Sequence, residues 1–254
     1  MKLGIGGKVA AITGASEGIG KATALAFGEE KAKVAICARR KESLQKAVHE
    51  IVTNTQCEVL SVEGDMANAS DVKRFFRRIV DRWGKVDILI NNVGAAKKAP
   101  FEQLTQDDWQ WSLATNLFSA ISCSFEAVEL MKGQRWGRIV NVASVSGKEP
   151  GPYLMASNAG KSALVSFSKS LAYEVAKYGI LVNCVLPGRI LSAQTSRLHT
   201  AEERQKIALD HIPLGRFGNA DEVAKFIVFL ASECSSYVTG GSFEVDGGFS
   251  KGLF

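Results

Sequence analysis

The sequence predicts a single α/β domain built on a doubly wound parallel sheet. Short apolar runs alternate with longer helical patterns from end to end, and most of the runs are apolar at nearly every position. Such runs are typical of parallel strands that helices bury on both faces. A glycine-rich turn joins the first run to the first helix, as this fold class requires. No repeat, low-complexity tract or linker divides residues 1–254, so one domain is expected.

Seven segments are predicted as strands, and the stretches between them as helices. The strands are expected at 8–13, 33–38, 57–64, 86–91, 137–144, 180–187 and 241–248, and the clearest helices at 20–31, 41–52 and 71–84. The alternation is interrupted at about 190–213, where "TAEERQKIALDH" (200–211) has the pattern of a short amphipathic helix. Insertions that follow a strand often close over a substrate, so a lid is predicted here.

The composition is that of an ordinary globular protein. Of 254 residues, 46% are hydrophobic and 22% are charged, which suffices for a substantial core. The net charge of +5 is spread along the chain, so no nucleic-acid partner is expected. Apolar runs are too short for a bilayer and no signal peptide is visible, which predicts a cytoplasmic protein without a membrane partner. The five cysteines and three histidines lack metal-ligand spacing, so no metal is expected.

The segment "TGASEGIG" (13–20) has the pattern of a phosphate-binding turn. Its glycines, Gly14, Gly18 and Gly20, allow a tight turn, close approach of the backbone to a pyrophosphate, and close packing of the helix on the sheet. The helix that follows offers unpaired N–H groups and the positive end of its dipole. Together these features predict a Rossmann-type nucleotide-binding fold.

The spacing TGxxxGxG resembles that of the short-chain dehydrogenase/reductase superfamily, and similar elements follow in the family's order. "NNVG" (91–94) resembles its NNAG element, "VLPGRILS" (185–192) its PGxIxT segment, and "VTGGSFEVDGG" (238–248) its C-terminal signature. The resemblance extends to 3-oxoacyl-acyl-carrier-protein reductases and implies an oxidoreductase with a nicotinamide cofactor. The cofactor-binding residues that it implies are Gly14, Ser16, Gly18, Ile19, Gly20, Arg39, Arg40, Asp65, Met66, Asn92, Gly94, Lys161, Pro187, Gly188, Ile190 and Ser192.

The residue that ends the second strand predicts which nicotinamide cofactor is used. An acidic residue there accepts a hydrogen bond from the ribose 2′-OH, whereas a nearby Arg accommodates a 2′-phosphate. The sequence has Ala38 at this position, followed by Arg39 and Arg40, which predicts NADP(H). The alternative is that these cations form only the solvated start of a helix. Asp65 and Met66 match the family's adenine-contacting pair.

The catalytic positions of the family are all occupied, but one has an unusual residue. Asn116 matches its helix asparagine, which holds a relay water, and Ser144 matches its catalytic serine. In the family, Tyr and Lys stand four residues apart, on one face of a helix. Lys161 is the lysine of this pair, and the residue four positions before it is Ser157. The usual catalytic tyrosine is therefore missing, as in an atypical branch of the family.

Three interpretations of this change remain open. In the first, Ser157, or a water held by it, Ser144 and Lys161, protonates a substrate carbonyl. In the second, Tyr153 takes over, because Pro152 suits the first position of a helix on which Tyr153 would align with Ser157 and Lys161; otherwise Tyr153 packs at the pocket edge. In the third, the chain binds NADPH but catalyses little reduction and is a regulatory or partner subunit.

The sequence thus predicts an NADPH-dependent reductase of ketones or aldehydes. A 3-oxoacyl thioester substrate is implied only by the resemblance. The resemblance also implies a homodimer or homotetramer built on the helices that carry Asn116 and Lys161. Their predicted outward faces, at 112–125 and 162–172, are short of charge, as expected for an interface rather than a solvated surface.

Overall fold

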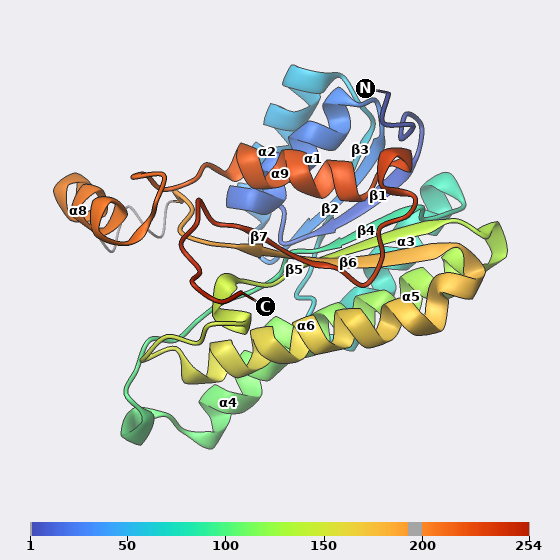
Figure 1. The fold of residues 1–254 in the computed structure, drawn as a ribbon. Helices are drawn as coiled ribbons and strands as arrows, with labels where there is room; N and C mark the ends of the chain where they lie inside the picture. Colours follow the sequence, from blue (N-terminus) through green and yellow to red (C-terminus); the bar gives the residue numbers. More distant parts are fainter. Residues whose placement is uncertain (1, 193–199, 254) are drawn as a thin grey trace.

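The computed structural model describes residues 2–192 and 200–253 and contains one parallel sheet (Figure 1). Its seven strands lie in the order β3-β2-β1-β4-β5-β6-β7. Their bounds are β1 Val9–Thr13, β2 Lys33–Ala38, β3 Val59–Glu63, β4 Ile88–Asn91, β5 Gly137–Val142, β6 Ile180–Pro187 and β7 Ser242–Val245. The strand order reverses between β1 and β4, which is the mark of a doubly wound fold. The predicted fold class is confirmed.

Helices cover both faces of the sheet (Figure 1). One face carries α1 (Gly18–Glu29), α2 (Lys41–Thr55) and α9 (Ala220–Leu230), and the other carries α3 (Ala69–Trp83), α5 (Ser119–Gln134) and α6 (Met155–Val175). The short α4 (Gln106–Leu113) leads into α5 through a π-helical turn, Ala114–Phe118. No helix in the described ranges is long and apolar enough to cross a membrane.

The two-sided burial explains why the strands are apolar at nearly every position. In β1, Ala10 and Ile12 pack into the core under α1, while Val9 and Ala11 pack into the core under α3 and α5. A strand in this position has no solvated face, so its sequence does not alternate. All five residues of β1 are buried as a result.

The predicted elements match the structure, with differences at their ends. The strands expected at 33–38 and 180–187 have those bounds, whereas the strand expected at 137–144 ends at Val142. Ser144 instead caps the 3-10 turn Val145–Gly147 by accepting a hydrogen bond from the Ser146 N–H at 3.2 Å. The amphipathic helix expected at 200–211 is α8, Ala201–His211. Its start carries a capping box between Thr200 and Glu203.

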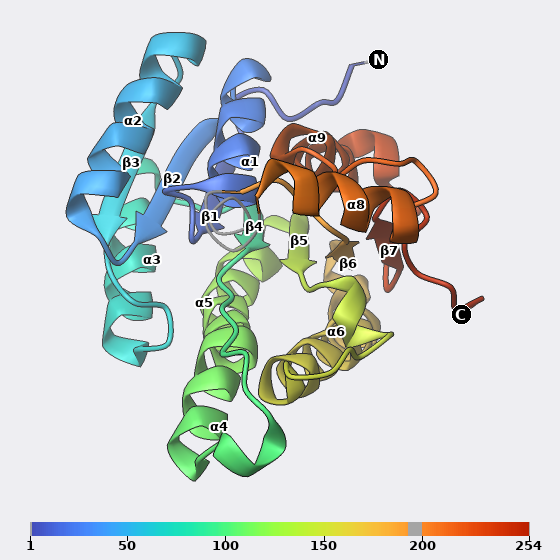
Figure 2. The same cartoon turned by 90° about the vertical axis from the view of Figure 1, so that its left-hand side faces the viewer.

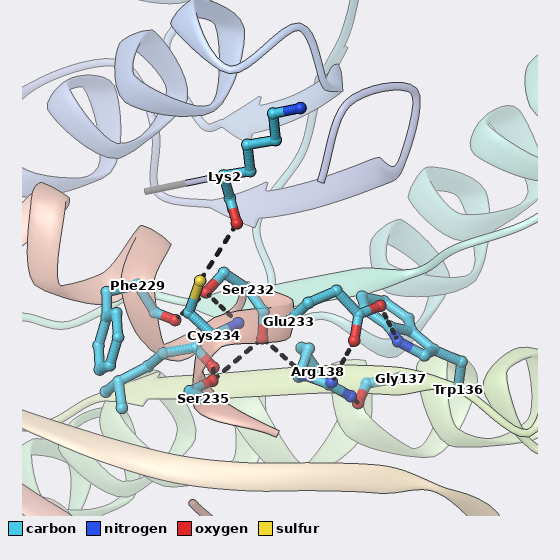
Figure 3. Close-up of polar contacts among 10 residues, drawn as sticks. Lys2, Trp136, Gly137, Arg138, Phe229, Ser232, Glu233, Cys234 and Ser235 are labelled. Atoms are coloured by element: carbon cyan, nitrogen blue, oxygen red, sulfur yellow. Dashed lines mark hydrogen bonds and ion pairs between the residues drawn. The ribbon is translucent and has the colours of Figure 1, made fainter. Parts of the chain in front are cut away.

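A buried guanidinium lies at the end of the sheet where the strands begin (Figure 3). The side chain of Arg138, in β5, is 4% exposed and lies 3.6 Å from the Glu233 carboxylate. Burial lowers the pKa of this guanidinium, and Glu233 opposes that shift. Glu233 also accepts a hydrogen bond from the Trp136 indole at 2.8 Å, and its N–H donates to the Leu3 carbonyl at 2.9 Å. Glu233, in the turn after α9, therefore joins β5 through its carboxylate and the N-terminus through its backbone N–H.

We predict that Glu233→Ala destabilises the fold, because it leaves the Arg138 guanidinium buried without an anion. The expected loss is roughly 1–3 kcal/mol of unfolding free energy, measured by urea denaturation. Glu129→Ala is the matched control, since Glu129 forms an exposed ion pair with Lys132 on the surface of α5. Equal losses in the two variants would show that the cluster around Glu233 contributes no more than a surface pair.

Candidate active site

The predicted site residues meet at the edge of the sheet where the strands end. Figure 2 looks toward this edge, where the turn before α1, the loop after β4, the end of β5 and the start of α6 come together. The strand order reverses here, between β1 and β4. Ligands of doubly wound folds bind in the crevice that such a reversal opens. The sheet topology thus brings together residues from these four separate segments of the chain.

The glycine-rich turn has the geometry of a phosphate cradle. Gly14 and Gly18 have φ angles of 63° and 57°, which side chains rarely adopt. A Cβ on Gly20 would lie 2.4 Å from the Gly14 carbonyl oxygen and 2.5 Å from Asn92 Nδ2. Asn92 Nδ2 donates hydrogen bonds to the carbonyls of Thr13 at 3.2 Å and Gly14 at 3.0 Å. Within the described residues, no side-chain cap is formed at the start of α1, so its first N–H groups are available to a pyrophosphate.

The two arginines after β2 differ in the lengths of their ion pairs. Arg40 is paired with Glu17. Arg39 has a side chain that is 61% exposed, and its guanidinium lies 3.9 Å from the Asp65 carboxylate. Met66 is buried beside this segment. Arg39 therefore has the longer of the two ion pairs, and its contact with a 2′-phosphate stays a prediction.

Lys161 is the most deeply placed charged group of the site. It is 7% exposed, and its ammonium donates a hydrogen bond to the Val142 carbonyl at the end of β5, at 2.9 Å. On another side, a Cβ on Gly94 would lie 2.8 Å from Lys161 Nζ. Burial lowers the pKa of this amine from 10.5 to about 8. Desolvation disfavours the charged form, and among the described residues Cys184 is the titratable group that interacts with it.

Asn116 holds the loop after β4 in place. It is fully buried in the π-helical turn. Its amide Nδ2 donates to the Ala95 carbonyl at 2.7 Å and to the Ser112 carbonyl at 3.0 Å, and its Oδ1 accepts from the Ala95 N–H at 3.1 Å. Both amide hydrogens are thus used on the backbone. The relay water expected at Asn116 stays a prediction, and the observed role of the side chain is to fix the backbone beside Gly94.

Ser157 lies one helical turn before Lys161, as the spacing predicts. Both residues belong to α6, and Ser157 is 8% exposed. Within the described part of the chain, the Ser157 hydroxyl forms no hydrogen bond. A Cβ on Gly160, on the adjacent face of α6, would lie 3.0 Å from Asn116 Cβ, so the helix packs closely on the π-helical turn. The hydroxyl of Ser157 is consequently held near the site but left available to a ligand.

The expectation that Tyr153 extends the helix is wrong. Helix α6 begins at Met155, and Tyr153 stands before it in a turn with a φ angle of 63°. A residue in this left-handed conformation does not continue a helix, so Tyr153 does not share a helix face with Ser157 and Lys161. The phenol side chain is 53% exposed and borders a hollow of about 330 Å³ that Asn158, Ala159 and Ser162 also line. The alternative, that Tyr153 packs at the edge of a pocket, matches this placement.

The segment after β6 approaches the C-terminal region of the chain. A Cβ on Gly188 would lie 2.5 Å from Asp246 Cβ, and the Gly188 N–H donates to the Val245 carbonyl at 3.1 Å. Ile190 forms a bridge with Gly218. Pro187 and Ser192 stand on either side of this stretch. Residues 193–199, near the start of the predicted lid, lie outside the described residues, so closure over a substrate stays a prediction.

Some functional contacts carried no sequence signal. The acceptor for Lys161 is the backbone carbonyl of Val142, and the partner of Asn116 is the backbone of Ala95. Any residue type offers such groups, so sequence reasoning could not find them. Thr13 was also missed: its hydroxyl accepts from the Asn92 N–H at 3.0 Å. No cluster of metal-ligating side chains occurs in the ranges that the structure describes.

The comparisons with known proteins agree with this geometry. Residues 14–250 match the family model described as enoyl-(acyl carrier protein) reductase. A 3-oxoacyl-[acyl-carrier-protein] reductase of Thermotoga maritima is 38% identical, over 95% of this chain and 97% of the relative; its counterpart in Synechocystis is 36% identical, over 95% and 96%. The crystal structure of L-sorbose reductase from Gluconobacter frateurii, complexed with NADPH and L-sorbose, superposes with a TM-score of 0.96 at 34% identity and covers both chains fully.

This chain belongs to the short-chain dehydrogenase/reductase superfamily. The predicted family and the predicted class of enzyme, an oxidoreductase, are confirmed. The matches extend over nearly the whole chain, so they include every segment that forms the site.

We predict that Arg39→Ala removes the preference of this reductase for NADPH over NADH. A charge-assisted hydrogen bond to the 2′-phosphate contributes roughly 1.5–3 kcal/mol, or about tenfold in affinity and more. Titration of both cofactors, followed by nucleotide fluorescence, measures the two affinities. Arg40→Ala is the matched control and should change the preference less, because Arg40 is engaged by Glu17. An Arg39→Ala variant that keeps its preference would contradict the assignment.

Proposed function

We propose that this chain is a reductase that uses NADPH to convert a ketone or aldehyde to an alcohol. The observation that carries the proposal is the hydrogen bond that the buried Lys161 ammonium donates to the Val142 carbonyl at the end of β5, two residues before Ser144 and from the helix that also carries Ser157. NADP(H) as the cofactor is confirmed by the family and by the NADPH complex of the similar sorbose reductase. A protein that only bound the nucleotide would need the cradle and the Lys161 amine, but not the Ser144 hydroxyl.

The cradle and Arg39 would hold the phosphates of the cofactor. Gly20 fits this role because the space that a Cβ would occupy is already filled by Gly14 and Asn92. When bound, NADPH supplies a hydride to the carbonyl carbon. The chain must then orient the carbonyl and deliver one proton to its oxygen.

We assign the remaining tasks by position. Ser144, at the end of β5, orients the carbonyl by donating its hydroxyl hydrogen. Lys161 lies within the site with ammonium hydrogens available to the ribose hydroxyls of the cofactor. Asn116 positions Lys161 indirectly, because it fixes the loop that packs against the amine. Ser157 is the hydroxyl nearest in sequence to Lys161 on the same face of α6.

Two substrate classes are candidates. The relatives named 3-oxoacyl-[acyl-carrier-protein] reductase favour a 3-oxoacyl thioester, whereas the sorbose reductase favours a polyhydroxy ketone. Both contain a ketone flanked by polar groups. Helix α8, in the predicted lid, would contribute to the choice between them.

A second candidate function is an NADP(H)-binding regulatory or partner subunit with little activity. The observation that favours it is the serine at position 157, because an aliphatic hydroxyl is a far weaker acid than a phenol. Under this alternative, the cofactor would bind normally and no carbonyl would be consumed.

The two functions make opposite predictions for NADPH in the presence of carbonyl compounds. We expect a panel of simple ketones, aldehydes, polyhydroxy ketones and 3-oxoacyl thioesters to contain at least one compound that consumes NADPH. Loss of NADPH absorbance measures the rate, and Ser144→Ala should lower it while nucleotide binding persists. Tight NADPH binding without consumption across the panel would favour the regulatory subunit instead.

We also propose that the chain is a homodimer or homotetramer in the cytoplasm. Its five cysteines are free, as in a reducing compartment. Helices α5 and α6 run side by side along one side of the molecule (Figure 1). This side exposes the large apolar side chains Trp111, Phe118, Phe125 and Tyr173. Exposed apolar patches of this kind mark interfaces.

Phe125→Glu is expected to dissociate the assembly, because it places a charge at the centre of an apolar contact. Light scattering at micromolar concentration measures the mass of both proteins. Leu209→Glu is the control: Leu209 is similarly exposed, at 67% against 72% for Phe125, but lies on α8. A wild-type protein that is monomeric in this experiment would contradict the proposed interface.

A further inference from the structure

A cation without an anionic partner lies in the segment that follows β6. Arg189 stands between Gly188 and Ile190, which are both predicted to contact the cofactor. Its side chain is exposed, and within the described part of the chain it forms neither an ion pair nor a hydrogen bond. Its guanidinium lies over the ring of Phe249, 5.5 Å from the ring centroid. An unpaired guanidinium beside the site can pair with a negatively charged group of a substrate.

We propose that Arg189 binds a carboxylate of the substrate, so that the carbonyl compound reduced by this chain is an oxo acid. The proposal rests on the carbonyl reduction proposed above and names a substrate class for it. A 3-oxoacyl thioester and a polyhydroxy ketone carry no charge beside the ketone, so neither needs a cation at this position. The keto group becomes a hydroxyl by gaining a hydride from NADPH and a proton, and the carboxylate is unchanged.

The backbone directs the Arg189 side chain away from the core. The Arg189 carbonyl accepts a hydrogen bond from the Gly218 N–H at 2.9 Å, and the Leu191 N–H donates to the Gly218 carbonyl at 2.8 Å. These bonds form a parallel bridge at Ile190, whose side chain packs against the core under α1 and α9. Successive side chains in a bridged, extended segment point to opposite sides. Arg189 therefore points away from that core, and its guanidinium reaches Phe249 instead.

Phe249 places this guanidinium between the end of β5 and helix α8. The ring packs against two apolar clusters, one of which contains the residues that flank Ser144 in the chain, while the other contains residues at α8. The ends of β5 and β6 are also adjacent, because the Ala143 N–H donates to the Val185 carbonyl at 2.8 Å. A substrate that binds between Ser144 and α8 is therefore in the neighbourhood of Arg189.

The carboxylates of the neighbouring strand and turn are engaged elsewhere. Glu244, in β7, forms an ion pair with Lys148 at 2.6 Å. Asp246 accepts hydrogen bonds from backbone N–H groups of the turn that follows it, at 2.9 and 2.8 Å. Neither carboxylate forms an ion pair with Arg189 in the described ranges, so the positive charge of Arg189 is not neutralised by the chain itself.

The chemistry of Arg189 favours a carboxylate over a phosphate. A planar guanidinium offers two parallel N–H groups that match the two oxygens of a carboxylate. Its single positive charge balances the single charge of a carboxylate, whereas a phosphate dianion would require a second cation. The contact with Phe249 provides no hydrogen-bond acceptor, so the N–H groups stay available, and it restricts the side chain before a ligand binds.

Pairs of charged and neutral substrates test the role of Arg189. The panel is 2-oxobutanoate, 3-oxobutanoate and 4-oxopentanoate, each assayed beside its methyl ester, which keeps the ketone and carries no charge. For at least one pair, we expect kcat/KM of the acid to exceed that of the ester by about tenfold or more. Added salt should lower this ratio, because it screens the exposed charge of Arg189. Equal values of kcat/KM for acid and ester in every pair would overturn the proposal.

Substitution of Arg189 separates recognition of the carboxylate from a structural role. Arg189→Gln should remove the preference for the acid, mainly through a higher KM, and leave kcat/KM for the ester unchanged. Arg189→Lys keeps the charge without the parallel N–H groups and should retain part of the preference. Arg216→Gln is the matched control, because Arg216 is an exposed arginine that is already paired with Glu222, at 2.7 Å. An Arg189→Gln variant that keeps the preference, or that loses acid and ester activity equally, would contradict the assignment.

A binding measurement without turnover distinguishes this proposal from the proposed function. Calorimetric titration of the same oxo acids into the protein loaded with NADP⁺, which has no hydride to transfer, measures recognition alone. We expect at least one acid to bind and Arg189→Gln to weaken its binding about tenfold. If the acid binds in this way and no carbonyl is reduced with NADPH, the proposed function fails and the carboxylate site stands. If ketones are reduced and no acid depends on Arg189 for binding, the carboxylate site fails and the reductase stands.

Discussion

The site depends on the burial of one amine against the backbone. Lys161 Nζ is held by the Val142 carbonyl on one side and closely approached by Gly94 on another. The approach of Gly94 is possible because Asn116 fixes the neighbouring Ala95 with hydrogen bonds to both its N–H and its carbonyl. The same burial removes the amine from water and lowers its pKa to about 8. Position and acidity therefore have a single cause.

The two ends of the parallel strands have different roles in this structure. At the edge where the strands end, glycines and loops leave N–H groups, hydroxyls and an amine facing a common space. At the opposite edge, side chains close the structure: Arg138, Trp136 and Glu233 tie the N-terminus to β5 and to the turn after α9 (Figure 3). A rigid sheet held at its far edge keeps the strand ends in register. That register sets the distances between groups that come from separate segments of the chain.

The serine at position 157 changes the chemistry of the site more than its architecture. A phenol would bring its own acidity and reach toward the substrate, whereas a serine hydroxyl is short and very weakly acidic. The surrounding groups are those expected of a reductase, and Lys161 has no other buried titratable partner than Cys184 among the described residues.

The sequence by itself determined the elements whose signals are local. Continuous apolar runs predicted strands buried on both faces, the glycine spacing predicted the turn before α1, and the four-residue interval between Ser157 and Lys161 placed both on one helix face. Only the tertiary structure decided where Tyr153 stands, because a left-handed turn before α6 leaves no reliable signal in a Pro-Tyr pair. The tertiary structure alone also shows that Glu17 forms its ion pair with Arg40 rather than with Arg39. The partners of Lys161 and Asn116 are backbone groups distant in the chain, and burial, which sets the pKa of Lys161, exists only once the chain has folded around it.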